Sequence, residues 1–206
     1  NEGIQGQVRF LSRVMRLVSD LSQHFDPDWP MTLTHAEPTD LSRKIRRSTH
    51  QLIQKATGDI EKFAFNTYVS ACMTTANTLT DLTKNINPTE AEAAAISEAI
   101  QCLILVLGPA APHTADELWE GLGMPGFTYQ ADWPKADPEL AKADMVNIAV
   151  QVNGKLRDTL ELPAGISQEE LVEAALASSK VKVYTDQGTI RKTIVVPGKL
   201  VNFVVN

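Results

Sequence analysis

The stretch VQVNGKLRDTLELP, residues 150–163, predicts a β-hairpin in the last third of this 206-residue chain. Apolar residues alternate with polar ones on both sides of Asn153-Gly154, as they do in half-buried strands. The Asn-Gly pair favours a two-residue type I′ turn because both residues tolerate positive φ. Lys155 and Arg157 follow the turn, and since they stand two apart on a strand, their side chains should leave the same face.

Downstream of the hairpin, the sequence predicts one helix and two further strands. Ser167 is a suitable N-cap for a helix that runs through Ser178, with glutamates in its first turn where the helix dipole favours them. The strands TIRKTIVV (189–196) and KLVNFVV (199–205) are joined at Pro197-Gly198. The tail is therefore expected to be a ββαββ-type unit of about 60 residues, a size that leaves it only marginally stable alone.

Upstream of residue 124, apolar residues recur at three- and four-residue steps, the pattern of amphipathic helices. Helices are predicted over 4–23, from a cap at Thr39 or Asp40 onward, over 65–85, over 89–107, and from a cap at His113 or Thr114 to Gly121 or Gly123. The second half of 89–107 is apolar all round. This helix should therefore be the central, most buried member of a bundle.

Turn-forming residues dominate the segment between these two regions, with MPGF, DWPK and DPEL each marking a turn. The predicted fold class is α+β, an N-terminal α-helical bundle followed by a small C-terminal ββαββ-type domain. The predicted ranges are 1–123 for the bundle, 124–144 for a Pro/Gly-rich junction, and 145–206 for the terminal domain.

The composition is that of an ordinary globular protein, with 43% hydrophobic and 21% charged residues. No window reaches the ~20 apolar residues of a membrane span, and the first residues lack the pattern of a signal peptide, which predicts a cytoplasmic protein. Cys72 and Cys102 stand among apolar residues and are expected to be core thiols. The four histidines show no metal-ligand spacing, so no metal site is predicted.

No constellation typical of a catalytic site is present: there is no phosphate-binding glycine loop, nucleophile elbow or paired carboxylate motif. Asp116, Glu117 and Glu120 cluster at the start of a predicted helix, where dipole and capping physics alone explain acids. Trp119 and Trp133 are read as packing anchors. No catalytic residue is predicted in this chain.

Basic residues carry the functional signal, although the net charge is −6. Residues 1–144 hold 12 basic and 19 acidic residues, whereas 145–206 hold 7 and 6. Charge acts over about 10 Å, so the local distribution of charge, and not the net charge, decides whether a surface can bind phosphate groups. The candidate phosphate-binding residues are Lys155, Arg157, Arg191, Lys192 and Lys199 in the tail, and Arg43 and Arg47 in the run Arg43, Lys44, Arg46, Arg47 and Lys55. The competing interpretation is that these are solvated surface charges.

Three motifs resemble a known family. VQVNGKLR followed by RKTIVVPGKLVNFVV is similar to the C-terminal domain of bacterial-type leucyl-tRNA synthetases, which are class I aminoacyl-tRNA synthetases. APHTADELWEGLG resembles a helix shared by the leucyl, valyl and isoleucyl enzymes, and GIQGQVRFLSRVMRLV resembles the first helix of their anticodon-binding bundle. The resemblance covers essentially the whole chain.

This resemblance implies a tRNA-binding portion of an enzyme that ligates leucine to tRNA(Leu) with ATP and Mg²⁺. It implies that the catalytic and editing domains lie elsewhere in the same polypeptide, that this portion itself holds no cofactor, and that the enzyme is a monomer without membrane attachment. The seven candidate residues would then contact tRNA, with Lys155 and Arg157 near its elbow. Two alternatives stay open, namely the equivalent part of a valyl or isoleucyl enzyme and a helical protein-interaction module.

Overall fold

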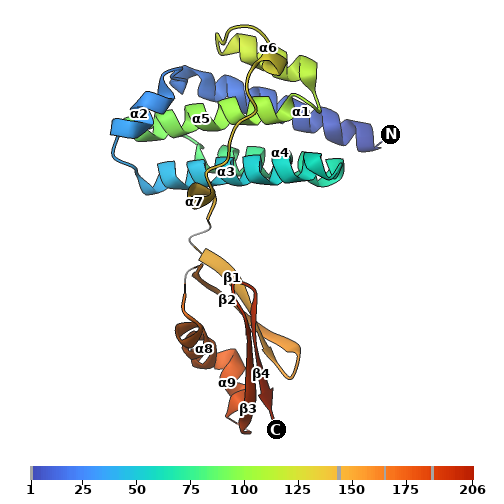
Figure 1. Cartoon of the computed structure of the whole chain (residues 1–206), viewed down its shortest axis with the longest axis vertical. Coiled ribbons are helices and arrows are strands. Elements are labelled where there is room, and N and C mark those ends of the chain that lie inside the picture. The colour runs from blue at the N-terminus through green and yellow to red at the C-terminus, as the bar shows by residue number, and fades with distance from the viewer. Residues whose placement is uncertain (1, 143–144, 165, 187) are drawn as a thin grey trace. The chain divides into compact units, whose positions relative to one another are not determined.

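The computed structural model describes residues 2–142, 145–164, 166–186 and 188–206, and the chain divides into two units, Asn1–Ala141 and Lys142–Asn206 (Figure 1). Among the described residues, those of the first unit are helical, and those of the second form a four-stranded sheet with two helices. The predicted α+β fold, with a helical bundle followed by a small mixed domain, is confirmed.

The long helices of the first unit run along a common direction (Figure 1). Its elements are, in chain order, α1 (Glu2–Leu21), η1 (Ser22–His24), α2 (Trp29–His35), α3 (Asp40–Glu61), α4 (Phe65–Leu82), α5 (Glu90–Leu107), α6 (Pro112–Gly121), η2 (Thr128–Gln130) and α7 (Pro138–Ala141). No helix of the described chain is both long enough and apolar enough to cross a membrane.

Helix α5 is the centre of the bundle, as its apolar second half predicts. Its residues are buried on all sides, including Ile96, Ile100, Leu103 and Ile104. A capping box between Thr89 and Glu92 begins the helix. The core around α5 is completed by side chains of α1, α3, α4 and α6.

Two features of the bundle differ from the prediction. Helix α6 begins at Pro112, with Ala111 as its N-cap, rather than at a cap on His113 or Thr114. Proline suits this first position because it has no N–H group that would need a partner. Helix α2 was not predicted, since its seven residues WPMTLTH are too few to show a helical period.

The segment predicted as a junction belongs largely to the helical unit. Trp133 Nε1 donates to Thr57 Oγ1 at 2.9 Å, and Gln51 Nε2 donates to the carbonyl oxygen of Ala141 at 2.9 Å. Trp133 is also packed against the core. The first unit therefore continues past residue 123 to Ala141, and the end of the predicted junction, residues 143–144, lies outside the described residues.

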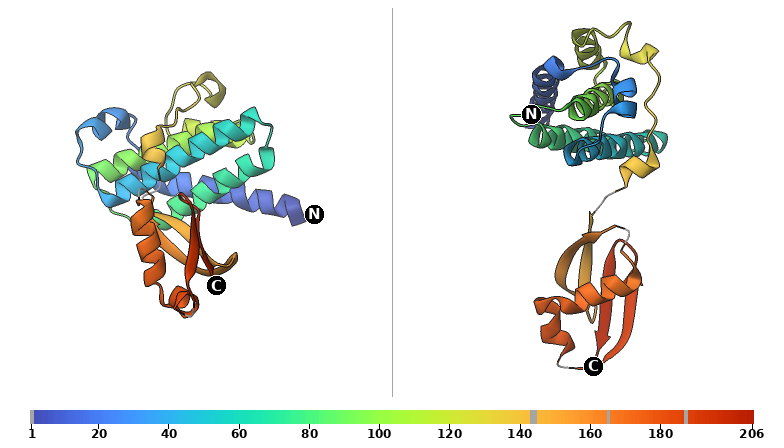
Figure 2. Two further views of the ribbon diagram at one scale, coloured as in Figure 1. Left: turned by 60° about the horizontal axis from the view of Figure 1, so that its bottom comes forward. Right: turned by 90° about the vertical axis from the view of Figure 1, so that its left-hand side faces the viewer.

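The second unit is a mixed sheet with strand order β2-β1-β4-β3, in which β1 and β4 are parallel and the other neighbours antiparallel. Two helices cover one face (Figure 2), and they bury Ile148, Val150, Val152, Val201 and Phe203 beneath them. The elements are β1 (Met145–Val152), β2 (Lys155–Pro163), α8 (Gln168–Ala177), α9 (Ser179–Thr185), β3 (Ile190–Val196) and β4 (Leu200–Val205).

The single helix predicted between the hairpins is in fact two helices. Ser167 caps α8 as predicted, in a capping box with Glu170. Ser178 then adopts an extended conformation, and α9 begins at the next residue. The break lets Val181 of α9 reach the sheet core.

Candidate nucleic-acid interface

The turn of the β1–β2 hairpin is fixed to the neighbouring strand. Asn153 and Gly154 have φ values of 51° and 75°, so the positive φ that a type I′ turn requires is present at both residues. The Gly154 N–H donates to Asn202 Oδ1 at 3.0 Å, and the Asn153 side chain forms two hydrogen bonds of 2.9 Å with the backbone of Val205. These hydrogen bonds fix the turn, and Lys155, the residue that follows it, is exposed.

A β-bulge interrupts the hairpin at Arg157. Leu156 pairs with Gln151 and Asp158 pairs with Val150, so Arg157 is the extra residue on β2. A bulge breaks the alternation of side chains, and both Arg157 and Asp158 contact α9. Lys155 pairs with the buried Val152, which places it on the same helix-covered side as Arg157.

Arg157 is held in place by a tyrosine of α9. Its Cζ atom lies 3.8 Å from the centroid of the Tyr184 ring, and its Nη1 donates to the Tyr184 hydroxyl at 3.0 Å. Its Nε is buried and has no hydrogen-bond partner among the described residues. This cation–π contact orients the guanidinium group without neutralising its charge.

Asp158, next to Arg157, forms its ion pair with a different cation, Lys180. Lys180 Nζ donates to Asp158 Oδ1 at 2.8 Å and Ser178 Oγ donates to Oδ2 at 2.6 Å. The hydrogen bonds from Lys180 and Ser178 lower the pKa of Asp158 to about 2, so it is ionised at neutral pH. Within the described residues, no carboxylate forms an ion pair with Lys155 or Arg157.

Two of the other predicted cations, Arg191 and Lys192, lie at the same end of the sheet as Lys155. Thr193 faces Phe203, which faces Val152, so Arg191 and Lys192 on the edge strand β3 lie at the same end as Lys155 on the opposite edge. Lys192 pairs with Val204, whereas Lys199 immediately precedes Leu200. At about 3.3 Å per residue, Lys199 lies more than ~13 Å away along the strands, at the other end of the sheet.

Arg191 is the bulged residue of β3 and has a local partner. Its Nε and Nη2 atoms donate to the side-chain oxygen of Asn206 at 2.7 and 2.6 Å, in the amide orientation that satisfies both groups. Because the acceptor is neutral, the positive charge of Arg191 is retained. Lys192 and Lys199 are exposed, and in the described chain neither forms an ion pair.

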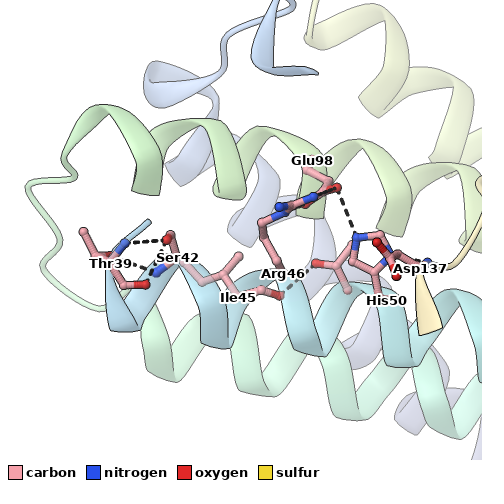
Figure 3. Close-up of polar contacts among 8 residues, drawn as sticks. Thr39, Ser42, Ile45, Arg46, His50, Glu98 and Asp137 are labelled. Atoms are coloured by element: carbon pink, nitrogen blue, oxygen red, sulfur yellow. Dashed lines mark hydrogen bonds and ion pairs between the residues drawn. The ribbon is translucent and has the colours of Figure 1, made fainter. Parts of the chain in front are cut away.

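The basic run on α3 separates into residues with different roles. Arg43 forms an exposed ion pair with Asp40 at 3.1 Å. Arg46 points inward instead: its Nε and Nη2 donate to the two carboxylate oxygens of the buried Glu98 on α5, at 2.7 and 3.2 Å (Figure 3). Lys44, Arg47 and Lys55 line a cleft between α3 and α4. The tRNA contacts predicted for Arg43 and Arg47 stay predictions.

His50 continues the buried network towards the end of the first unit (Figure 3). Its Nδ1 accepts from the backbone N–H of Asp137 at 2.9 Å, and its Nε2 lies 3.2 Å from Glu98 Oε1. An accepting Nδ1 carries no proton, so Nε2 must be the donor to Glu98. The neutral Nε2–H tautomer of His50 thus connects α3, α5 and the segment before α7.

The residues with potential catalytic chemistry have structural surroundings. Burial raises the pKa of the free thiols of Cys72 and Cys102 to about 12, so neither is a thiolate at neutral pH. Asp116 Oδ1 accepts from the backbone N–H and hydroxyl of Thr128 at 2.9 and 2.6 Å, anchoring the loop after α6. In the described part of the chain, no three His, Cys, Asp or Glu side chains group as a metal site.

The contact between Arg157 and Tyr184 is not predictable from the sequence pattern. The segment SSKVKVYT alternates apolar and polar residues, a strand-like period that hides helix α9. Lys182 is exposed on the same helix and was not among the predicted contacts. The available sequence signal for placing this segment at the site was its charge, because Lys180 and Lys182 stand close to Tyr184.

Comparison with known proteins gives concordant results. Residues 42–173 match the family described as the anticodon-binding domain of tRNA ligase. The whole chain is 40% identical to leucine–tRNA ligases of Dehalococcoides mccartyi and Pseudomonas putida, and spans about a quarter of their length (24% and 23%). The ternary complex of Agrobacterium radiobacter K84 agnB2 LeuRS, tRNA and LeuAMS contains a similar fold, with TM-score 0.82, 26% identity, and coverage of 98% of this chain and 25% of that one.

Proposed function

The chain belongs to the family of anticodon-binding domains of tRNA ligases, and from this premise we propose that it is the tRNA-binding portion of a leucyl-tRNA synthetase. That enzyme ligates leucine to tRNA(Leu) with ATP, and this portion binds and positions the tRNA. The observation that carries the proposal is whole-chain similarity to leucine–tRNA ligases. The same similarity favours a leucyl over a valyl or isoleucyl enzyme.

The remaining partners follow from this proposal. The catalytic domain would lie elsewhere in the same polypeptide, and the enzyme would act as a cytoplasmic monomer. ATP and Mg²⁺ would be bound there and not by this portion. Among the residues that the structure describes, no three His, Cys, Asp or Glu side chains group as a metal site, and we assign no step to either cofactor.

Lys155 and Arg157 are proposed as the principal tRNA contacts of the second unit. They share one side of the hairpin, and Tyr184 restricts the position of the Arg157 guanidinium group, so the Arg157 side chain would lose little conformational entropy on binding. Arg191 and Lys192 would add positive charge at the same end. Lys199 was predicted as a further contact, but its position at the opposite end of the sheet favours a minor role.

The test is tRNA(Leu) binding by the 206-residue chain, measured by fluorescence anisotropy between 50 and 300 mM salt. The Lys155→Gln/Arg157→Gln variant is expected to bind at least about tenfold more weakly at 0.1 M salt, with a salt slope shallower by about 2, because two phosphate contacts are lost. Lys199→Gln, which removes one charge at the other end of the sheet, is the control and should change affinity less than about twofold. If the anisotropy of tRNA(Leu) does not change on addition of the chain at 50 mM salt, the chain is instead favoured to be a protein-interaction module.

A further inference from the structure

The turn of the β1–β2 hairpin carries the only Asn-Gly pair of the chain, Asn153-Gly154. In such a pair, the backbone nitrogen that follows the asparagine can attack the side-chain carbon Cγ and close a five-membered succinimide ring. Glycine resists this attack least because it has no Cβ. Both residues are exposed, and apart from the neighbouring residues no described atom lies within 4 Å of the position that a Cβ on Gly154 would occupy. Water therefore reaches this peptide bond.

Strand β4 holds both groups that would have to react. The nucleophile, the Gly154 nitrogen, donates its hydrogen to Asn202 Oδ1 at 3.0 Å. The electrophile is Cγ of the Asn153 amide, whose Nδ2 donates to the carbonyl oxygen of Val205 and whose Oδ1 accepts from the Val205 N–H, both at 2.9 Å. Reaction requires the two atoms to meet in an aligned geometry, while these hydrogen bonds hold each of them to β4.

The reaction needs water and no other reagent. A bond forms from the Gly154 nitrogen to Asn153 Cγ, the bond from Cγ to Nδ2 breaks, and ammonia leaves with the proton of the Gly154 N–H. Water then opens the ring at either carbonyl, which yields aspartate or isoaspartate. Because the Gly154 N–H loses its proton and Nδ2 departs, the hydrogen bonds of these two groups to Asn202 and Val205 must both be lost.

The contact that holds the Asn153 amide lies at one end of the sheet. The last pair in the register of β1 with β4 joins Val152 to Phe203. Val205 lies two residues beyond this pair and meets the hairpin through the Asn153 side chain. The ends of secondary-structure elements open more readily than their centres, so β4 can separate from the turn without unfolding of the sheet core.

We propose that Asn153 is a deamidation site that β4 keeps unreactive. The side chain of Asn202 and the backbone of Val205 block succinimide formation, and the reaction proceeds from the state in which the end of β4 has left the turn. The product cannot restore the native turn, because an aspartate has no N–H to donate to Val205 and an isoaspartate lengthens the backbone of a two-residue turn. Modification therefore accumulates with the time that this end of the sheet spends open.

Deamidation also changes the charge beside the proposed tRNA contacts. A carboxylate at position 153 stands two residues from Lys155, within the ~10 Å over which charges interact. Among the described residues Lys155 has no ion-pair partner, so the new carboxylate would compensate a charge that is otherwise available to phosphate. This consequence rests on the proposed function, whereas the modification itself does not.

The test follows Asn153 by peptide mass spectrometry while the 206-residue chain is incubated at mildly alkaline pH. In the chain unfolded in guanidinium chloride, Asn153 should react at least about tenfold faster than in the folded chain, because two hydrogen bonds no longer oppose the reaction. Asn202→Ala, which removes the acceptor of the Gly154 N–H, should speed the folded-state reaction about fivefold. The matched control Asn147→Ala removes an exposed amide at the other end of β1 and should change the rate less than about twofold.

Equal rates at Asn153 in the folded and the unfolded wild-type chain would overturn the proposal. So would an unchanged rate in Asn202→Ala whose sheet is folded by circular dichroism. If that variant unfolds, the wild type provides the second measurement: guanidinium chloride below the unfolding transition should raise the deamidation rate in parallel with hydrogen exchange of the Gly154 amide. Deamidation that does not follow this exchange would show that opening of β4 is not required.

The effect on binding is measured separately. Asn153→Asp should bind tRNA(Leu) at least about threefold more weakly at 0.1 M salt than Asn147→Asp, which adds the same charge away from Lys155. Equal affinities of the two variants would overturn the effect on binding. If the wild-type chain does not bind tRNA, the proposed function fails, and the deamidation rates still decide whether β4 protects Asn153.

Discussion

Replacing Arg46 with methionine is expected to lower the free energy of unfolding of the helical unit by about 3 kcal/mol at pH 7, because a buried carboxylate loses its main partner. The Glu98 side chain is only 5% exposed, and Arg46 contacts both of its oxygens. His50 would still donate to Glu98, so we expect a loss at the lower end of the usual range. Urea unfolding followed by circular dichroism measures it.

The pH dependence gives this prediction a distinct signature. Burial by itself would raise the pKa of Glu98, but the hydrogen bonds from His50 and Arg46 outweigh burial and lower it from the ordinary value of 4.5. In the wild type, the stability contributed by this lowered pKa is present above pH ~4.5 and is lost as the pH falls through the folded-state pKa. Without Arg46, burial dominates and the carboxyl group should take up a proton more readily.

The stability difference between wild type and Arg46→Met should therefore shrink on acidification, since the uncompensated charge disappears once Glu98 is protonated. Arg43→Met is the matched control, because its ion pair with Asp40 is exposed, and it should cost less than about 1 kcal/mol. Equal losses in the two variants would show that the buried pair contributes no more than the surface pair.

Short sequence patterns were sufficient to predict the elements whose conformation is determined by residues close together in the chain. The apolar second half of α5 identified the centre of the bundle, and Asn153-Gly154 identified the hairpin turn. Both signals lie within a few residues, so no tertiary information is needed. Helices α2 and α9 were missed because their short sequences show no helical period and packing decides their conformation.

The candidate site was less accessible from sequence. The common side of Lys155 and Arg157 follows from strand alternation, but the bulge at Arg157 and its contact with Tyr184, 27 residues away, depend on the assembled sheet. Likewise, Arg46 belongs to a run that looks solvated, and its partner Glu98 stands 52 residues away. The position of Lys199 required the strand register.

Phe203→Ala is expected to unfold the second unit at room temperature while leaving the helical unit folded. Phe203 is fully buried, and it faces Val152 on one neighbouring strand and Thr193 on the other. Truncating a buried phenylalanine costs about 3–5 kcal/mol. A unit the size of residues 142–206 has a total stability of roughly 3–10 kcal/mol, so this loss is comparable to the whole.

Phe203→Ala should unfold the second unit alone, because the hydrophobic clusters of the two units share no residue. Amide NMR spectra of Phe203→Ala should lose the dispersed strand signals, while the thermal transition of the helical bundle stays within a few degrees of its wild-type temperature. Val204→Ala, on the same strand but only half-buried, should keep the unit folded. Joint unfolding of both units in Phe203→Ala would mean that the bundle depends on the sheet for its stability.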